Sequence, residues 1–431
     1  MKSEFDQLPD FGFASAEEIK ETQLRLFNEH VRYCRQRSPY YRRLLADYPD
    51  QDFTWETLRD LPTTGKSQLA EHNEEFLAVP REEIVDISLT SGTTGTPTRV
   101  CYIKGDLDVL TYNERIGLGA AGIRAGDRVL LTCTIDRCFI AGLAYYLGVV
   151  ALGANAIRNG LNTIESHAEI LRTMKPEAII CVPSFLSKLG AYAVEKNIPT
   201  GQVRTIVCIG EPMRDRQMQP TALTAKIQAA FPNASIHGTY ASTEIGTSFT
   251  ECEGMCGGHP PADLALVELL DDQERPVAPG QPGEVVVTPF RFRGSPLIRF
   301  KTGDVSFQVP GDCSCGRHSM RLGPILGRKA QLLKIRGCAV FPASFFNVLD
   351  GIPGIVQYYL EARGAQLSDE ATIFIATYGN QPANLEDIGN LLYARTRLHV
   401  PVRQISCEEA NARVLGTSRK PVHFFDYRQP L

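Results

Sequence analysis

The sequence has no long basic run, and its 431 residues carry a formal net charge of −4. Nucleic-acid backbones and anionic membranes bind through dense positive charge, so neither is an expected partner. The first six residues also lack the apolar core of a secretory signal peptide and include Glu4 and Asp6. We therefore expect a cytoplasmic protein that acts on a small molecule or a protein.

One stretch without charged residues, Phe139 to Ile157, is long enough to cross a bilayer. It is rich in glycine, contains Asn155 and is followed directly by Arg158. This pattern favours a buried helix over residues 142–152 that leads into a short strand over 153–157. We expect no membrane span here.

Cysteine is thinly spread over most of the chain, where eight of the twelve residues occur singly, as core thiols do in a large protein. The other four fall in one region that also holds two histidines: Cys252, Cys256, His259, Cys313, Cys315 and His318. Thiolates with an imidazole suit a closed tetrahedral zinc site. Idle buried thiols are the alternative.

The chain also lacks a Walker A motif, because no lysine follows Gly95. The segment Thr90–Thr98 instead combines two glycines with Ser and Thr residues and has no bulky side chain. Glycines let a backbone approach phosphates, and hydroxyls add donors that occupy little room. The segment predicts a phosphate-binding loop, with an ordinary Thr/Gly turn as the alternative.

Ser15 and Glu18 form a capping-box pattern, and the apolar positions that follow fit a helix ending before Pro39. A second short helix is expected over residues 40–46. Apolar strands then alternate with helices, which indicates a parallel sheet covered on both faces. The predicted strands are 129–133, 154–157, 178–182, 205–209 and 235–240, and the predicted helices include 166–174 and 222–230.

Gly117–Gly122 matches the dinucleotide pattern G-x-G-x-x-G, but no apolar strand leads into it, so we reject that function. Short strands at 266–270, 284–288 and 305–309 indicate a small β-rich subdomain. A strand at 371–377 and a helix at 385–397 follow a hinge near 329–331. We expect an α/β protein: a large N-terminal domain (1–328) with parallel-sheet and β-rich subdomains, and a small mobile α+β C-terminal domain (329–431).

Further segments follow the loop in a fixed order: His237–Glu244, Arg299–Asp304, Gly327–Arg328, Lys334–Gly337 and Ser418–Lys420. Together with the loop they resemble the core motifs of the adenylate-forming superfamily of acyl-CoA ligases. Three N-terminal segments resemble its phenylacetate-coenzyme A ligase branch: Arg37–Arg43, Leu61–Lys66 and Ala78–Pro80. The resemblance spans nearly the whole chain.

The resemblance implies that a carboxylate attacks the α-phosphorus of ATP, releasing pyrophosphate, and that a thiol then takes the acyl group from the adenylate. The acid is expected to be an aryl or small organic acid, and the thiol to be coenzyme A. Transfer to a carrier protein or an amine is a second reading. A catalytically silent nucleotide-binding protein is a third, and a homodimer stays open.

By the same resemblance, the loop holds the β and γ phosphates through Ser91, Gly92, Thr93, Thr94 and Gly95. Glu244 is assigned to Mg²⁺, with Thr243 beside it in the catalytic group; an ion-paired glutamate is the alternative. Asp304 accepts hydrogen bonds from the ribose hydroxyls, and Arg328 helps to hold the sugar.

The adenine is flanked by Gly210, Glu211 and Pro212, and Tyr240 stacks on it unless that side chain is simply packed in the core. Lys420 is the implied catalytic cation. It sits on the mobile domain, so rotation would withdraw it before thiolysis. A solvated lysine near the C-terminus is the alternative.

The acyl pocket is assigned to Phe139, Ile140, Gly142 and Ala241, although the first two could equally be core residues. The charged pair Asp136–Arg137 just before them suggests a substrate with a second polar group. By analogy with certain members of the branch, the zinc ligands are Cys252, His259, Cys313 and Cys315, with Cys256 and His318 as alternates.

This chain departs from the family pattern at several positions. Relatives commonly carry a loop lysine where Thr96 or Thr98 stands, a charged hinge residue at Ala330 and a glycine at Arg419. Because the loop has no cation of its own, adenylation should depend strictly on Mg²⁺ at Glu244 and on Lys420.

Overall fold

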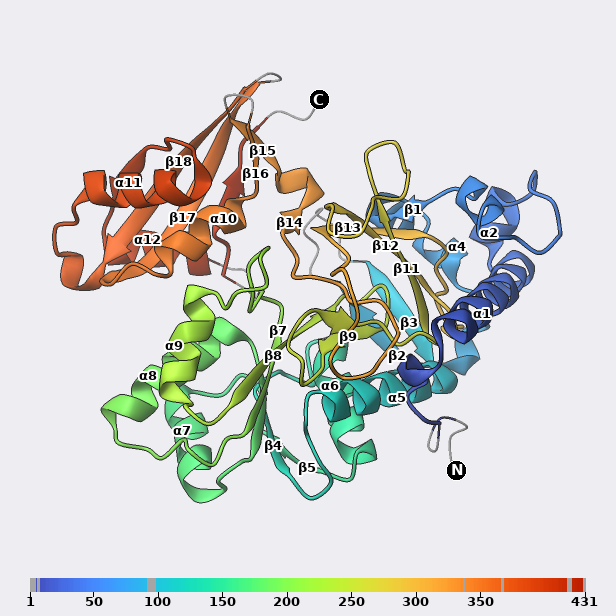
Figure 1. Ribbon diagram of the computed structural model, residues 1–431, viewed down its shortest axis with the longest axis horizontal. Helices are drawn as coiled ribbons and strands as arrows, with labels where there is room; N and C mark the ends of the chain where they lie inside the picture. The colour runs from blue at the N-terminus through green and yellow to red at the C-terminus, as the bar shows by residue number, and fades with distance from the viewer. Residues whose placement is uncertain are drawn as a thin grey trace. The chain divides into compact units, whose positions relative to one another are not determined.

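The computed structural model (Figure 1) describes residues 5, 8–90, 98–335, 338–365, 368–416 and 421–428. Its contacts divide the chain into two compact units. The first comprises Met1–Pro220 and Thr224–Ile325, and the second comprises Thr221–Leu223 and Leu326–Leu431. The roles predicted for the two domains remain predictions.

Helix α1 (Ala16–Arg37) begins at the predicted capping box, in which Ser15 and Glu18 bond to each other's backbone. It ends at Ser38, whose side chain caps α2 (Pro39–Leu44). The buried face of α1, including Phe27 and Val31, packs into one core with the β-rich sheet described below. The first helix was thus predicted correctly, while the second begins one residue and ends two residues earlier than predicted. Both helices cover that sheet.

The central sheet has seven strands in the order β10-β9-β8-β7-β6-β4-β5. Its parallel part consists of β4 (Arg128–Leu131), β5 (Asn155–Arg158), β6 (Ala178–Cys181), β7 (Thr205–Ile209) and β8 (Ser235–Ala241). Strands β9 (Ser248–Glu251) and β10 (Gly258–His259) continue it antiparallel. Every residue of β6 and β7 is buried, as a sheet covered on both faces requires.

Helices lie on both faces of this sheet (Figure 1). One face is covered by α5 (Lys104–Ala120) and α6 (Ile140–Ala151), which share a core cluster with β4, β6 and β7. The other carries α7 (Ile164–Thr173), α8 (Pro183–Glu195) and α9 (Ala222–Ala230). The predicted α/β class is confirmed, because the apolar runs and the helical stretches alternate as expected.

The β-rich sheet contains β1 (Thr64–Gly65), β13 (Phe300–Ser306), β12 (Gly283–Pro289) and β11 (Ala265–Leu270), in that order. The strand predicted over residues 305–309 was wrong in its bounds. Pairing with β12 begins at Phe300 and crosses a register shift between Glu284 and Val286. The polar motif therefore lies within this strand. Its apolar and polar residues do not alternate, so no strand was predicted there.

Two features of the sequence turn out to be helical. The rejected G-x-G-x-x-G segment lies in α5 and its C-terminal turn. The uncharged stretch forms α6 and then β5, close to the predicted helix and strand. Among the described residues, no helix is long and apolar enough to span a membrane.

Within the second unit, a sheet has the order β19-β18-β17-β20. It is formed by β17 (Ile355–Ala365), β18 (Ser368–Thr377), β19 (Val402–Gln404) and β20 (Phe424–Asp426), with α10 (Pro342–Leu349), α11 (Leu385–Thr396) and α12 (Cys407–Leu415). The hairpin partner β17 was not predicted, and β18 begins earlier than predicted because its polar start pairs with β17.

Candidate active site and Cys/His cluster

The predicted phosphate loop is framed by a two-stranded hairpin, β2 (Ile84–Leu89) and β3 (Arg99–Ile103). At its base, the N–H of Thr90 donates to the carbonyl of Thr98 (3.0 Å), and the N–H of Thr98 donates to Oγ1 of Thr90 (3.1 Å). Ser91, Gly92, Thr93, Thr94 and Gly95 themselves lie outside the described residues, so their phosphate contacts stay predictions.

Glu244 is buried just beyond the end of β8, and its carboxylate lies 3.7 Å from Nζ of Lys66. Lys66 is the first residue of α3 (Lys66–Glu71), and its side chain is 24% exposed. The preceding carbonyl, of Thr243, accepts a hydrogen bond from the hydroxyl of Tyr102 (3.0 Å). The structure thus places a fixed cation beside the residue assigned to Mg²⁺.

Sequence reasoning missed Lys66 as a site residue. It appeared only as the last residue of a segment that resembles the ligase branch. The available signal was indirect: the loop lacks a lysine, so a neighbouring element could supply the charge. Which element does so depends on β1 pairing with β13, a contact between distant parts of the sequence.

Tyr240 and Asp304 meet across two sheets: the tyrosine hydroxyl donates to Oδ2 of the carboxylate over 2.9 Å. Burial raises the pKa of Tyr240 well above its usual value, so the phenol stays protonated and donates. The N–H of Asp304 is in turn bonded to Oγ1 of Thr302 (3.1 Å). The predicted adenine and ribose residues are therefore neighbours, and the tyrosine orients the carboxylate.

The segment predicted to flank adenine follows β7 directly. Gly210 has a φ of +79°, a conformation that glycine adopts without strain. The carboxylate of Glu211 accepts a hydrogen bond from the N–H of Ser184 (2.9 Å), at the start of α8. Pro212 leads on to Arg214, whose role in the fold is described below. The segment is thus fixed at the carboxyl end of the parallel sheet, where α/β enzymes bind ligands.

The residues assigned to the acyl pocket differ in how deeply they are buried and in what they contact. Ile140 belongs to a buried cluster with Tyr102, while Phe139 is half-buried against the core of the central sheet. At Gly142, a Cβ would lie 1.8 Å from the carbonyl oxygen of Thr134, so close helix packing accounts for that glycine. Ala241 is exposed at the end of β8. A contact of these residues with an acid stays a prediction.

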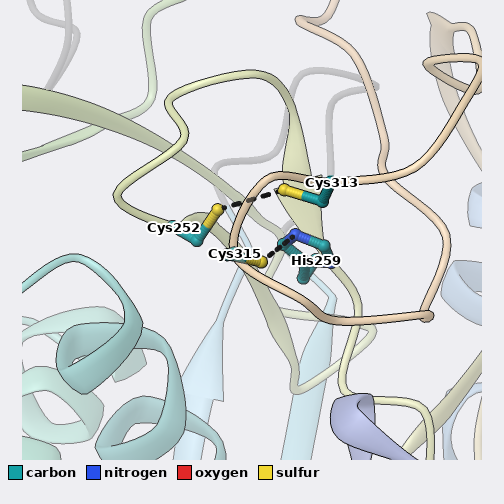
Figure 2. Close-up of side chains that lie close together, drawn as sticks. All are labelled: Cys252, His259, Cys313 and Cys315. Atoms are coloured by element: carbon teal, nitrogen blue, oxygen red, sulfur yellow. Dashed lines mark hydrogen bonds between the residues drawn. The ribbon is translucent and has the colours of Figure 1, made fainter.

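Cys252, His259, Cys313 and Cys315 converge, as Figure 2 shows, with their candidate ligand atoms all within 4.8 Å of one another. Sγ of Cys252 lies 3.5 Å from Sγ of Cys313, and Sγ of Cys315 lies 3.6 Å from Nε2 of His259. Tetrahedral zinc with Zn–S bonds of about 2.3 Å holds its sulfurs about 3.8 Å apart. The spacing fits zinc and is too long for a disulfide.

The loops around the cluster are shaped for it. At Gly254, a Cβ would come within 3.4 Å of the sulfurs of both Cys252 and Cys313, so a larger residue would crowd the ligands. The N–H of Gly254 also donates to the sulfur of Cys252 (3.3 Å). Nδ1 of His259 is bonded to Oγ of Ser319 (3.0 Å), which leaves Nε2 facing the thiols.

The imidazole of His259 is ready to bind a metal, whereas the thiol of Cys252 would first have to lose its proton. Burial, with Arg317 and Arg321 nearby, lowers the pKa of His259 to about 4, so its imidazole is neutral at pH 7. Burial raises the pKa of Cys252 to about 12, an effect that the Gly254 N–H partly offsets. Binding of zinc there would release a proton, which makes affinity pH-dependent.

The two alternates, Cys256 and His318, are not part of the four-residue cluster. The carbonyl of Cys256 accepts from Arg321, and the N–H of His318 donates to the carbonyl of Gly12. Lys420 and Arg419 lie outside the described residues. Arg328 belongs to the second unit, where it precedes a short 3-10 helix over Lys329–Gln331.

The family model for AMP-binding enzymes matches residues 31–290. The chain belongs to this family. Among curated proteins, it is 32% identical to a phenylacetate-coenzyme A ligase of Thermus thermophilus over 375 residues, which cover 85% of this chain and 83% of the relative. The corresponding ligase of Escherichia coli is 27% identical over 77% of this chain and 76% of its own length. The chain is therefore an AMP-forming acid–thiol ligase on the phenylacetate-coenzyme A ligase-like branch.

Solved structures agree on the fold. A 2-hydroxyisobutyryl-CoA ligase in the postadenylation state matches with a TM-score of 0.86 and 21% identity, covering 99% of this chain and 95% of that one. The predicted family and fold class are thus confirmed. The likeness in fold does not carry that ligase's substrate over to this chain.

Proposed function

We propose that this enzyme joins a small organic acid, with an aryl acid as the first candidate, to the thiol of coenzyme A at the expense of ATP. The observation that supports this most is a set of two contacts near the end of β8: Tyr240 with Asp304, and Glu244 with Lys66. A ribose-binding carboxylate and a charged pair at the phosphates are what adenylation requires.

In the first half-reaction, an oxygen of the acid attacks the α-phosphorus of ATP and pyrophosphate leaves with the bonding electron pair. Asp304 would hold the ribose hydroxyls, with its carboxylate oriented by Tyr240. Lys66 would stabilise the charge that develops on the departing pyrophosphate. Glu244 fits Mg²⁺ as an oxygen ligand, and the ion when bound would neutralise phosphate charge.

In the second half-reaction, the thiol attacks the acyl carbon of the adenylate, loses its proton and displaces AMP. Lys420, which the family motif assigns to adenylation, would have left the site by then with the second unit. Transfer to a carrier protein or an amine differs only in the nucleophile. A silent nucleotide-binding protein would keep the ATP contacts and perform neither step.

The residues around the assigned acyl pocket bear on the choice of acid. Phe139, one of the residues assigned to the acyl pocket, is half-buried and could lie beside an aryl ring. Asp136 and Arg137 are both exposed just before it, with Arg137 in a left-handed conformation (φ 62°). A second polar group on the acid could reach this pair. We therefore place phenylacetate behind acids that carry an additional polar substituent.

We also propose that Cys252, His259, Cys313 and Cys315 bind one structural Zn²⁺. Four buried or half-buried ligands with no open position fit a structural site better than a catalytic one. Metal analysis of protein purified without chelator should find about one equivalent of zinc. Less than about a tenth of an equivalent would contradict the assignment.

The reaction is tested by acid-dependent exchange of labelled pyrophosphate into ATP over a panel of aryl and hydroxy acids. Stimulation by at least one acid supports adenylation, and mass spectrometry after adding coenzyme A then looks for the thioester. Exchange without a thioester favours a carrier-protein or amine acceptor. No exchange with any acid, with ATP binding retained, favours the silent protein.

A further inference from the structure

The buried carboxylate of Glu251 joins three segments that the sequence keeps apart. Its Oε1 accepts hydrogen bonds from Nε of Arg214 (3.0 Å) and from the N–H of Gly257 (3.2 Å). Its Oε2 accepts from the N–H of Gly238 (2.8 Å). Both charged side chains are less than a tenth exposed, so the contacts are shielded from water.

Two of these segments belong to the nucleotide site. Arg214 follows the adenine-flanking residues 210–212, and its Nη2 donates to the carbonyl of Ile236 in β8 (3.1 Å). Gly238 lies in the same strand, two positions before Tyr240, the residue that orients Asp304. Glu251 therefore fixes the two backbone segments between which an adenosine would bind.

The third segment belongs to the Cys/His cluster. Glu251 immediately precedes Cys252, and Gly257 stands two residues before His259. Gly257 has a φ of +89°, and a Cβ there would lie 3.0 Å from the carbonyl oxygen of Leu322, so this turn has little freedom. Nδ1 of His237, in β8, also contacts the carbonyl of Cys252 (3.1 Å).

We propose that Glu251 is a positioning residue through which metal occupancy of the Cys/His cluster sets the affinity for ATP. This inference rests on the proposed function and on the proposed zinc site. When the four ligands are held together, the turn at Gly257 and the strand before Cys252 are fixed, and the carboxylate keeps its bonds to Arg214 and Gly238. When the ligands separate, the carboxylate loses that support and the adenine-flanking segment loosens.

The test is the dissociation constant of ATP, measured by calorimetry on the full-length protein, once zinc-loaded and once stripped with a chelator. In the wild type, stripping should weaken ATP binding about tenfold, within the usual range of coupling between two sites, and added zinc should restore it. Circular dichroism on the stripped protein checks that it remains folded.

Glu251→Gln removes the charge that Arg214 needs, and the double variant Arg214→Met/Glu251→Gln removes both charges so that no unpaired ion is buried. In either protein, zinc should still bind. ATP should bind about as weakly as to the stripped wild type, and stripping should change the dissociation constant by less than about twofold. This non-additivity is the signature of transmission through Glu251.

The matched control is Glu268→Gln, which breaks another buried ion pair of the same unit, with Arg299 (3.0 Å). Glu268 contacts neither the cluster nor residues 210–214 in any described bond, so the tenfold response to zinc should persist. A purely stabilising role for Glu251 predicts that its variant behaves as this control does.

The failures are distinguishable. No ATP binding by the zinc-loaded wild type would contradict the proposed function. Binding with the same dissociation constant before and after stripping would overturn this inference alone, and so would a Glu251→Gln protein that still responds tenfold. Protein that binds ATP but no zinc would overturn the zinc site and the inference together.

Discussion

The Cys/His cluster lies within the first unit, whereas the residues assigned to nucleotide binding are divided between the two units. All four cluster residues come from that unit, and their ligand atoms lie within 4.8 Å of one another. The nucleotide motifs meet in two pairs, Tyr240 with Asp304 and Lys66 with Glu244. Their remaining partners are assigned to the phosphate loop and to the second unit.

This difference follows from what each site has to do. A structural metal site gains by being closed, because every preformed ligand adds to the stability of the folded state. An adenylating site has to admit ATP and an acid, release pyrophosphate and then accept a thiol. We therefore propose that part of its charge is supplied by Lys420 on a mobile domain, whereas Tyr240 and Asp304 are already in contact.

Lys420→Ala tests the proposed role of the second unit in adenylation and should have the largest effect. Pyrophosphate exchange should fall about a thousandfold, because a cation that stabilises developing charge is lost. Thioester formation from synthetic acyl-adenylate should change less than about threefold, since we propose that the lysine serves only the first half-reaction. Equal losses in both half-reactions would contradict this division.

Cys313→Ser tests the proposed zinc site in the Cys/His cluster. Zinc content should fall from about one equivalent to under a tenth, and the melting temperature should drop on the order of 10 °C. Cys256→Ser is the control, because Cys256 lies outside the cluster. It should keep its zinc and its melting temperature. If the two variants lose zinc equally, the ligand set is wrong.

His30, a buried residue of the first unit, makes the stability of that unit depend on pH. Burial, with Arg293 nearby, lowers its pKa to about 3; its ring is bonded to the carbonyl of Leu297 (3.0 Å). Because the unfolded chain binds this proton near pH 6.5, stability is complete above that pH and is lost as the pH falls. Denaturant unfolding should show a loss of roughly 2–3 kcal/mol between pH 6.5 and 4.5 from this residue.

The control is His30→Gln. This variant should be less stable at neutral pH, but its free energy of unfolding should change less between pH 6.5 and 4.5. Other histidines with a lowered pKa, such as His237 (about 4), contribute to the pH dependence of stability that remains in this variant. An unchanged slope in the variant would show that His30 is not the source.

Lys66→Met should have the smallest effect, because Mg²⁺ and Lys420 would still supply charge. The turnover number for exchange should fall about tenfold. The apparent affinity for Mg²⁺ should not weaken, since Glu244 loses a competing partner. Lys104→Met, at an exposed lysine paired with Asp108, is the control and should change neither. A weaker Mg²⁺ affinity with an unchanged turnover number would contradict the role of Lys66.

Much of the fold was predictable because its signals are local. The buried strand Thr205–Ile209 was predicted residue for residue, since a short run of β-branched and apolar residues favours a buried strand. The strand Phe300–Ser306 was misplaced, because it is defined by pairing with distant residues and carries a polar motif. The strand Ile355–Ala365 was also missed, although its partner β18 follows it in the chain, because its apolar and polar residues do not alternate regularly.

The candidate site divides in the same way. The Cys/His region could be singled out because ligand chemistry is specific and few residues provide it, and its four ligands were then chosen by analogy with the ligase branch. Lys66 and Glu251 could not, because lysine and glutamate are common and their role depends on contacts between segments far apart in the chain. At Gly142, close packing against Thr134 also accounts for the glycine, and its assignment to the acyl pocket stays a prediction.

The central claim is that this chain activates an acid with ATP, and pyrophosphate exchange measures that step alone. Purified enzyme is incubated with ATP, labelled pyrophosphate and each acid of the panel, with and without Mg²⁺. Exchange is expected only when an effective acid and the divalent metal are both present. Exchange that needs no acid, or that proceeds substantially without divalent metal, would contradict the central claim.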